Sequence, residues 1–400
     1  MAARILVIDH TAALGGAEVA LARALDAIDR RAFEPVVLLL EHGPLLSRLR
    51  DSGVRVAVLE ASGGLTDVGR AEAASSLTAL LRNALRSAVL VPRLVRAIRR
   101  ARVDLVVANS LKSAVLTSLA APLAGRRWVW HVNDRIASDY LPRPLVVGMR
   151  MLARFGPRRI VANSRATRSA LPNVPEGRIV VAYPGVRLEH GHADADAAPT
   201  EAGVVFGLLG RIAPTKGQLE FVRAAAELRD VLPDVRFRII GEALFNDAEF
   251  AAGARALPAA LGVDDRVEFT GWTDAPGAAI AQLTALVHAS PVPEPFGQVV
   301  VEAMLAGVPV IATNAGGVPE IVDPDGAGRD LGDGVILSRT GLLVPPGDAA
   351  ALASAMTWIA RHPRERADMA ARAAEDARRR FDVRLTARII EDTWRAALGR

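Results

Sequence analysis

The stretch SPVPEPFGQVVVEAMLAGVPVIATNAGGVPEIV, residues 290–322, decides the fold predicted for this chain. Its first three prolines, within residues 291–295, cannot lie inside a helix, so the chain is predicted to be extended there. Good helix formers and apolar residues then predict a helix over 298–306, and the run 309–313 predicts a buried strand. The stretch therefore reads as a strand end, a turn, a helix, a second strand and a glycine turn.

Two glutamates lie around the start of the predicted helix. Glu294 precedes the helix, and Glu302 lies about one turn inside it. The first backbone N–H groups of a helix have no partner within the helix, so they would face a ligand between the two carboxylates. Two hydrogen-bond acceptors beside an anion-binding helix terminus suit a ligand that carries both hydroxyls and phosphates. A nucleotide sugar has that composition.

The complete pattern resembles a known family. The E-x7-E pair, followed by AGVPVIA and GGVPEIV, resembles the signature of retaining glycosyltransferases of the GT4 type, or group 1. The spacing alone also occurs in ordinary helices with two surface glutamates. The glutamate pair together with the two following motifs is specific for the family, but it says little about the substrate. The resemblance covers essentially the whole chain. It implies an α/β protein with the GT-B fold, in which two Rossmann-like doubly wound domains face a central cleft.

Length, composition and charge narrow the class of protein. The 400 residues suggest two or three domains, and 51% hydrophobic with 23% charged residues is typical of a globular chain. The absence of cysteine excludes disulfides and thiolate sites. The net charge of +5 could help the protein bind an acidic surface, or it could result only from a genome that favours arginine. The N-terminus enters a strand directly and no apolar run could span a bilayer, so a cytoplasmic protein is expected.

The first half of the chain alternates short apolar runs with helical segments. Near-continuous apolar runs predict a parallel sheet that helices cover on both faces, and ligands of such sheets bind at the carboxyl ends of the strands. Functional residues should therefore follow the runs directly. The runs are residues 4–9, 35–40, 55–60, 104–110, 128–134, 159–164 and 180–185.

The first strand is followed by a glycine turn, LGGAE. Gly15 and Gly16 permit a positive φ and a close backbone approach before a helix N-terminus. The pattern is not G-x-G-x-x-G, so no nicotinamide site is predicted. A tight strand-to-helix turn is the local alternative. The resemblance implies that the turn faces the acceptor and the donor diphosphate, so both glycines are predicted to bind substrate.

A histidine lies at the carboxyl end of another strand. His131 follows the run WVW, beside Asn133 and Asp134. A lone histidine is more often structural than catalytic. The resemblance implies a catalytic role in which His131 reaches the transferred sugar. It also implies that Ser164 and Arg165 line the acceptor side.

The segment from residue 73 to residue 103 is strongly basic and contains no acidic residue. It is predicted to be helical on both sides of Pro92. A basic amphipathic helix can lie on anionic lipid, which would place the protein peripherally at the inner face of the membrane. A solvated face of a domain helix is the alternative, and the spacing does not decide between the two. The seven arginines are Arg82, Arg86, Arg93, Arg96, Arg99, Arg100 and Arg102.

A polar, acidic tract separates two halves of the chain. Residues 188–203 are predicted to be an interdomain linker. Its histidines and aspartates do not follow a strand, so neither a metal site nor the D-x-D site of GT-A enzymes is predicted. The N-terminal, acceptor-side domain is predicted to cover residues 1–187 and the C-terminal, nucleotide-sugar domain residues 204–380. In GT-B enzymes the last helix returns to the first domain, so residues 381–400 are assigned there.

The second half repeats the alternation and carries two cations after its first strand. Arg211 and Lys216, in GR-x4-KG, flank a turn before a helix N-terminus, where a diphosphate would bind. A pair of surface cations is the alternative, but the pattern matches the phosphate-binding pair of the family. Both residues are therefore predicted to be catalytic. The predicted strands are residues 204–211, 236–242, 267–272, 285–290, 309–313 and 341–347.

Two features of the second half leave open which residues contact the base and the ribose of the nucleotide. Trp272 follows a strand and could pack on a base or fill the rim of the core. Residues 323–339, rich in Gly and Asp, replace a shorter link in the family. They are predicted to form a surface insertion.

The resemblance implies a hexosyltransferase of glycan biosynthesis that moves a hexose from a nucleoside diphosphate sugar to an acceptor hydroxyl with retention. The two cations and helix N–H groups would stabilise the departing phosphate, so no metal or other cofactor is predicted. Glu294, with the N–H groups of Phe296 and Gly297, would hold the sugar, Glu302 the ribose, and Gln298 is a further predicted substrate contact.

The sequence leaves several partners and alternatives open. The acceptor could be a glycan, a lipid or a small molecule, and no nucleic acid is expected. The base and the sugar of the donor are also open. An epimerase or phosphorylase with the same fold and a non-catalytic sugar-nucleotide binding module are the alternatives.

Overall fold

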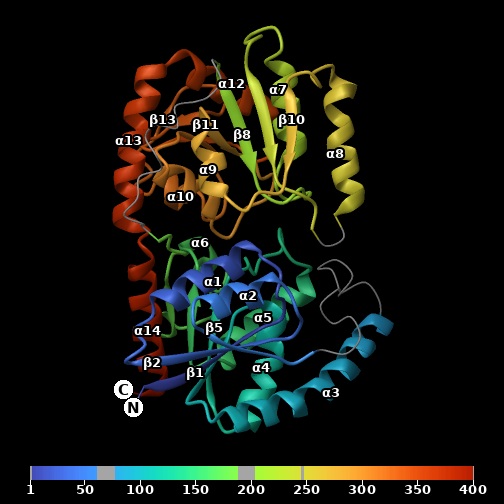
Figure 1. Ribbon diagram of the computed structural model, residues 1–400, viewed down its shortest axis with the longest axis vertical. Coiled ribbons are helices and arrows are strands. Elements are labelled where there is room, and N and C mark those ends of the chain that lie inside the picture. The colour runs from blue at the N-terminus through green and yellow to red at the C-terminus, as the bar shows by residue number, and fades with distance from the viewer. Residues whose placement is uncertain (1, 61–76, 188–202, 245–246, 400) are drawn as a thin grey trace. The chain divides into compact units, whose positions relative to one another are not determined.

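The computed structural model describes residues 2–60, 77–187, 203–244 and 247–399, with backbone alone for residues 77–88 (Figure 1). The predicted linker therefore lies outside the described residues, except for Gly203. The side chains of Arg82 and Arg86 lie outside them too. Within the described part of the chain, no helix is both long and apolar enough to cross a membrane.

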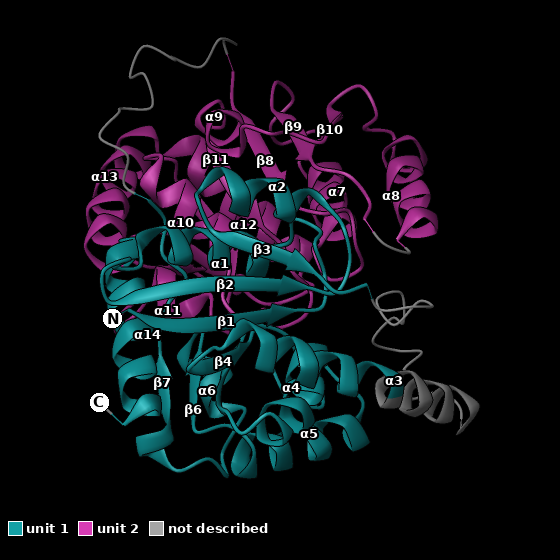
Figure 2. Cartoon of the chain, turned by 60° about the horizontal axis from the view of Figure 1, so that its bottom comes forward, with its two compact units in different colours: residues 1–187, 381–400 teal, residues 188–380 magenta. Residues whose placement is uncertain are grey.

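The chain divides into two compact units (Figure 2). Unit 1 contains residues 1–187 and 381–400, and unit 2 contains residues 188–380. Each unit has its own sheet and its own hydrophobic core.

Unit 1 contains a parallel sheet of seven strands in the order β3-β2-β1-β4-β5-β6-β7. The central strand β4 is buried along its whole length, as its run of Leu, Val and Ala predicts for a sheet covered on both faces. The strand order reverses direction between β1 and β4, which makes that edge the topological switch point of the unit. The strands are β1 (Ala3–Asp9), β2 (Phe33–Leu39), β3 (Arg55–Val58), β4 (Leu105–Ala108), β5 (Arg127–Val132), β6 (Arg159–Ala162) and β7 (Ile179–Val181).

Helices cover both faces of this sheet. Helices α1 (Gly16–Ala27), α2 (Pro44–Asp51) and α14 (Val383–Leu398) bury apolar residues in one core cluster, and α3 (Leu77–Ala101), α4 (Leu111–Leu123) and α5 (Arg143–Phe155) in another. The last helix is held by Trp394, whose ring packs edge-on against Phe33 of β2 at 5.4 Å between centroids. Short helices α6 (Arg165–Ser169) and η2 (Glu176–Arg178) complete the unit.

Unit 2 contains an eight-stranded sheet in the order β10-β9-β8-β11-β12-β15-β14-β13, whose switch point lies between β8 and β11. Six strands are parallel, and β13 and β14 run antiparallel at one edge. The strands are β8 (Val205–Leu209), β9 (Arg236–Ile240), β10 (Val267–Gly271), β11 (Ala285–His288), β12 (Val310–Thr313), β13 (Arg329–Asp330), β14 (Ile336–Leu337) and β15 (Leu342–Val344).

The helices of unit 2 alternate with its parallel strands. They are α7 (Gln218–Glu227), α8 (Ala248–Leu261), α9 (Pro276–Ala281), α10 (Gln298–Leu305), α11 (Pro319–Val322), α12 (Ala349–Arg361) and α13 (Pro363–Arg380). The segment 323–339 differs from the predicted surface insertion, because it contributes β13 and β14 to the sheet and buries Val335 in the core.

Candidate functional site

Two helices begin at the switch point of unit 2, and glycine starts both of them. Gly217 precedes α7 with φ +82°, and Gly297 precedes α10 with φ +110°. Both values lie in the left-handed region that glycine adopts without strain. Neither glycine can cap the helix with a side chain, so the first turns of α7 and α10 present backbone N–H groups at the carboxyl ends of β8 and β11.

The loop before α7 lies close to the end of β11. A Cβ on Gly217 would lie 2.0 Å from the carbonyl oxygen of Ala289, so only glycine fits there. Ser290 joins the same two loops, since its hydroxyl donates to the carbonyl oxygen of Thr215 at 2.7 Å. The loop that carries Lys216 is therefore fixed against the loop that leads to Glu294.

A second glycine turn supports Glu294 from behind. The N–H of Gly317 donates to the carbonyl oxygen of Glu294 at 2.8 Å. A Cβ on the neighbouring Gly316, which has φ +67°, would lie 2.0 Å from that same oxygen. The GGVPEIV motif thus contributes two glycines that allow the backbone to pass directly behind the carboxylate residue.

Lys216, His288 and Glu294 form a side-chain cluster at this point. The Glu294 side chain is 13% exposed, and one of its oxygens forms an ion pair with the Lys216 ammonium. Its other oxygen lies 3.2 Å from Nε2 of His288, at the end of β11. Burial raises the pKa of Glu294, but the Lys216 and His288 charges and hydrogen bonds outweigh it and hold the pKa well below its usual range. Glu294 is therefore a fixed carboxylate at neutral pH.

Arg211 lies on the same loop as Lys216 but has a different partner. Its guanidinium is 3.2 Å from a carboxylate oxygen of Asp247, and its carbonyl oxygen accepts a hydrogen bond from Gln218 on α7 at 2.8 Å. The two predicted phosphate-binding cations thus flank the N-terminus of α7. Of the four predicted catalytic residues, the structure brings Lys216 and Glu294 into contact.

The remaining predicted donor contacts lie around α10. Phe296 is buried just before the helix, while Gln298 and Glu302 are partly buried on its first two turns. Trp272 is 50% exposed, and its indole N–H donates to Asp274 at 2.9 Å. It does not fill the rim of the core, so packing on a base is the alternative that stays open.

In unit 1, polar side chains follow four neighbouring strands and form a chain of hydrogen bonds. The amide of Asn109 donates to the buried carboxylate of Asp9 at 2.7 Å. Asn133 donates to the carbonyl oxygen of Asn109 at 3.0 Å, and Asn163 donates to the carbonyl oxygen of Asn133 at 3.2 Å. The chain crosses the carboxyl edge of the sheet from β1 through β4 and β5 to β6. This is the edge at which ligands of parallel sheets bind.

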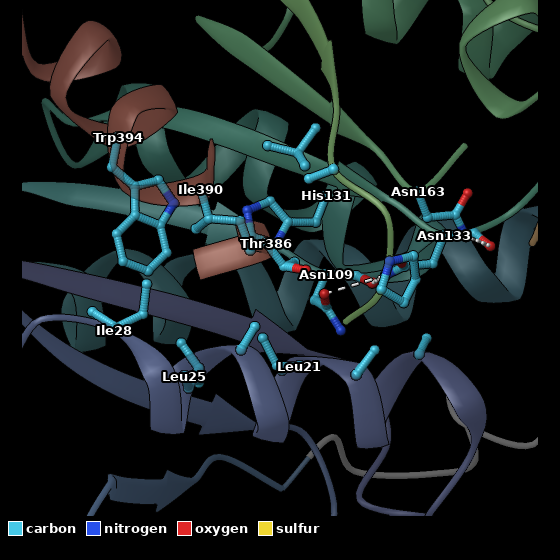
Figure 3. A pocket seen from close by; sticks show the side chains of 16 residues that line it. Leu21, Leu25, Ile28, Asn109, His131, Asn133, Asn163, Thr386, Ile390 and Trp394 are labelled. Carbon is cyan, nitrogen blue, oxygen red and sulfur yellow. Dashed lines mark hydrogen bonds between the residues drawn. The ribbon is translucent and has the colours of Figure 1, made fainter. Parts of the chain in front are cut away.

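His131 lies in a pocket between the sheet, α1 and α14 (Figure 3). Leu21 and Leu25 of α1 and Trp394 of α14 line this pocket, and the imidazole is stacked on the Trp394 ring at 6.4 Å between centroids. The His131 residue is only 6% exposed, and burial lowers its pKa to about 4. The ring is neutral at pH 7, and its Nε2 has no hydrogen-bond partner among the described residues.

The glycine turn before α1 differs from its prediction in one respect. Gly15 has φ −91°, and neither Gly15 nor Gly16 adopts a positive φ. A Cβ on Gly15 would lie 2.4 Å from a carboxylate oxygen of Glu18, so a larger residue there would displace the Glu18 side chain. Burial, together with the nearby charge of Asp9, raises the pKa of Glu18 to about 8.

Ser164 has a structural contact in addition to its predicted place on the acceptor side. Its hydroxyl accepts the N–H of Thr167 at 2.9 Å and so caps α6. In the described ranges, no group of three or more His, Asp or Glu side chains is placed to hold a metal ion.

Two family models match the chain, one over each half. Residues 14–190 match Glycosyltransferase Family 4, and residues 194–376 match Glycosyl transferases group 1. The structure also resembles HepE from Anabaena, solved with UDP and glucose, with a TM-score of 0.83 and 26% identity over 98% of this chain and 100% of that one. The chain belongs to the group 1 glycosyltransferases. The predicted family and the predicted fold of two Rossmann-like domains are confirmed.

Curated relatives of this group 1 glycosyltransferase are similar over part of their length. A D-inositol 3-phosphate glycosyltransferase of Kribbella flavida is 32% identical over 66% of this chain and 63% of its own. A 2-deoxystreptamine glucosyltransferase of Streptomyces kanamyceticus is 40% identical over 31% of each chain. The chain thus spans less than two thirds of the length of the first curated relatives that it matches.

The sequence of this glycosyltransferase held signals that the prediction of its site did not use. His288 lies at the carboxyl end of a buried strand, which is the same signal that singled out His131. Asp9, Asn109 and Asn163 also follow strand ends, as residues that bind ligands in parallel sheets do.

Proposed function

We propose that this protein is a retaining glycosyltransferase that moves a hexose from a nucleoside diphosphate sugar to an acceptor hydroxyl. The observation that carries the proposal is the cluster of Lys216, His288 and Glu294 beside the N-termini of α7 and α10. Cations and N–H groups would meet a diphosphate there, and a fixed carboxylate would meet a sugar. Both parts of a nucleotide sugar therefore have partners at one switch point.

In the proposed reaction, the anomeric bond breaks and negative charge develops on the departing diphosphate. Lys216, Arg211 and the first turn of α10 at Gly297 and Gln298 would stabilise that charge through hydrogen bonds that are strongest in the transition state. These groups are positive without a metal ion. We therefore propose that transfer needs no divalent cation and no other cofactor.

Glu294 would hold sugar hydroxyls, together with backbone N–H groups at Phe296 and Gly297. Its low pKa suits this role, because an ionised carboxylate accepts hydrogen bonds from hydroxyl groups. Glu302, one turn along α10, would hold the ribose hydroxyls. His131 would contact the transferred sugar, and the turn at Gly15 and Gly16 would contact substrate, as the family resemblance implies.

The relatives support the donor class and leave the acceptor open. HepE was solved with UDP and glucose and, in a second structure 25% identical to this chain, with UDP-glucose. The curated relatives are named for inositol phosphate and deoxystreptamine acceptors. We propose a UDP-hexose as the first donor to test, with the acceptor hydroxyl on a glycan, a lipid or a small molecule.

A thermal-shift titration with UDP, GDP, ADP and dTDP in EDTA tests the proposal. A nucleotide at about a hundred times its dissociation constant should stabilise the unit that binds it by roughly 2.7 kcal/mol. We expect one nucleotide to raise the melting temperature without a metal, and Lys216→Ala to abolish the rise. If no nucleotide raises it, the proposed donor site is wrong.

Turnover separates a transferase from the other enzymes and modules that share its fold. The matching nucleotide sugar should release its nucleoside diphosphate faster when an acceptor pool is added. Conversion of the sugar without net release of nucleoside diphosphate would indicate an epimerase, and release that no acceptor accelerates would indicate hydrolysis of the donor. Binding without either reaction would indicate a non-catalytic module.

A further inference from the structure

One face of unit 1 exposes large apolar side chains in an ordered arrangement. Seven of the ten large apolar side chains that the described part of the chain exposes belong to α3, α4 and α5. Their exposed fractions range from 41% for Val115 to 69% for Phe155. A concentration of this kind is typical of an interaction surface, whereas apolar residues scattered singly are normal. The seven are Val89, Val115, Leu119, Leu123, Val147, Met151 and Phe155.

The spacing of these residues produces rows along two helices. Val115, Leu119 and Leu123 are four residues apart on α4, so they lie one above another on one side of the helix. Val147 and Phe155, with Met151 between them, repeat the spacing on α5. Helix α4 contacts both α3 and α5, and the three helices lie on the same side of the sheet (Figures 1 and 2). All three bury other residues in the same core cluster, so the exposed rows face away from the sheet.

The charge of these three helices has one sign. None contains an acidic residue, whereas α3 carries six arginines, α4 a lysine and α5 three arginines. Arg93 and Arg99 donate to the backbone carbonyl oxygens of Glu60 and Leu123, and neither forms an ion pair with a carboxylate of the described residues. A groove between α3 and α4 brings the apolar row and the positive charge together. Leu123 of the row on α4 lies in it beside Arg96, Arg99 and Arg100 of α3.

We propose that this face, the α3–α4–α5 face, binds the surface of a bilayer that contains anionic phospholipid. The apolar rows would enter the boundary between headgroups and acyl chains, and the arginines of the groove would bind lipid phosphates. An acyl boundary accounts for the apolar rows and an anionic headgroup layer accounts for the absence of acidic residues. A neutral bilayer or a soluble anion would account for only one of the two. The proposal does not depend on the proposed function.

Vesicle sedimentation with the full chain tests the proposal. We compare phosphatidylcholine vesicles with vesicles that contain about 30% phosphatidylglycerol, in about 0.1 M and about 0.5 M NaCl. We expect binding to the anionic vesicles alone, weakened at least about fivefold by the higher salt. No binding to anionic vesicles, or equal binding to both kinds, would overturn the proposal.

Two variants and a matched control identify the surface. Leu119→Ser with Met151→Ser removes apolar side chains, and Arg96→Gln with Arg100→Gln removes charge. Each should weaken binding at least about tenfold. Val231→Ser with Arg364→Gln removes one apolar side chain and one charge at exposed positions of unit 2 and should leave binding unchanged.

The same variants separate this proposal from its rivals. Their thermal shifts with nucleotide should match the wild type, so a failure of the donor site is distinguishable from a failure of the lipid surface. Sedimentation velocity measures self-association. If the wild type is a dimer and Leu119→Ser with Met151→Ser is a monomer that still binds vesicles, the face is an interface between two copies and the lipid proposal is wrong.

Discussion

At the scale of single residues, the environment rather than the residue type decides what each titratable group can do. Two glutamates show the contrast. Glu294 contacts a lysine and a histidine and is held ionised, whereas burial and the nearby charge of Asp9 raise the pKa of Glu18. The E-x7-E pair and the motifs after it led the sequence analysis to predict a site at Glu294. The raised pKa of Glu18 could not be predicted, because it depends on burial and on a neighbour from another element.

The two glutamates of the E-x7-E pair should affect different steps. Under the proposed function Glu294 holds the transferred sugar, so Glu294→Ala should lower kcat about a hundredfold with little change in nucleotide affinity. Under the same proposal Glu302 holds the ribose, so Glu302→Ala should weaken nucleotide binding about tenfold and change kcat less. Nucleotide titrations and steady-state kinetics on both variants measure this. Equal losses of nucleotide affinity would contradict the division of roles.

Removing the contact of His288 with Glu294 should change how kcat depends on pH. Removing His288 takes away a charge and a hydrogen bond that lower the pKa of Glu294, so that pKa should rise in His288→Leu. The acidic limb of kcat against pH should therefore move to higher pH, with a smaller change near neutrality. His362→Leu, in a histidine that stacks on Trp358, is the control. An unchanged acidic limb in His288→Leu would show that the contact does not matter to turnover.

The buried His131 should make unit 1 sensitive to acid. Its pKa of about 4 lies below the ordinary 6.5, so the folded state binds this proton less readily than the unfolded chain. Above pH 6.5 this histidine is neutral in both states and does not change the free energy of unfolding. As pH falls from 6.5 to about 4, the unfolded chain binds the proton and the folded state progressively loses stability. His131→Phe keeps an aromatic ring and removes the titration. Relative to wild type, it should gain about 3 kcal/mol in free energy of unfolding between pH 7 and pH 4. A pH-independent difference between the two proteins would contradict the prediction.

At the scale of elements, glycine turns place the loops of the donor site. Gly217 and Gly297 both adopt a positive φ directly before a helix, and the sequence predicted a turn at each of these places. The close approach of Gly217 to Ala289 could not be predicted, because these residues are distant in the sequence and meet only through the sheet. The strands β13 and β14 were missed for a related reason. They are two residues long and show no apolar alternation.

Replacing Gly217 with alanine should disturb the donor site. A Cβ there would lie 2.0 Å from a backbone oxygen and would force alanine into a left-handed conformation. We expect Gly217→Ala to lose about 2 kcal/mol of stability and most of its nucleotide affinity. Gly277→Ala, at a helical position with open space around the Cβ, is the matched control and should be neutral. Wild-type nucleotide affinity in Gly217→Ala would show that the loop can adapt.

At the scale of the whole molecule, each unit has its own core, so each should unfold as its own cooperative transition. The sequence predicted two doubly wound sheets because alternating apolar runs specify such sheets directly. It could not show that Trp394, near the end of the chain, completes the core around β2 and β5.

Trp394→Ala should therefore lower only one transition. The side chain is fully buried against Phe33 and His131, and removing it should cost unit 1 about 3–5 kcal/mol. Differential scanning calorimetry should show the unit 1 transition at a lower temperature and the unit 2 transition unchanged. Trp358→Ala, in α12 of unit 2, should produce the reverse pattern. A single transition that shifts in both variants would show that the units unfold together.

The chain leaves unit 1 and returns to it at one place. Val186 donates to the carbonyl oxygen of Phe381 at 2.8 Å and accepts from the N–H of Val383 at 3.1 Å. Glycine is needed beside them, because a Cβ on Gly185 would lie 2.4 Å from the Cα of Val383. Unit 2 is thus encoded by one uninterrupted block of the gene, inserted where two neighbouring backbone segments already touch. Such a block can be exchanged for its counterpart from another family member with only two junctions, which offers recombination a short route to a different unit 2 on an unchanged unit 1.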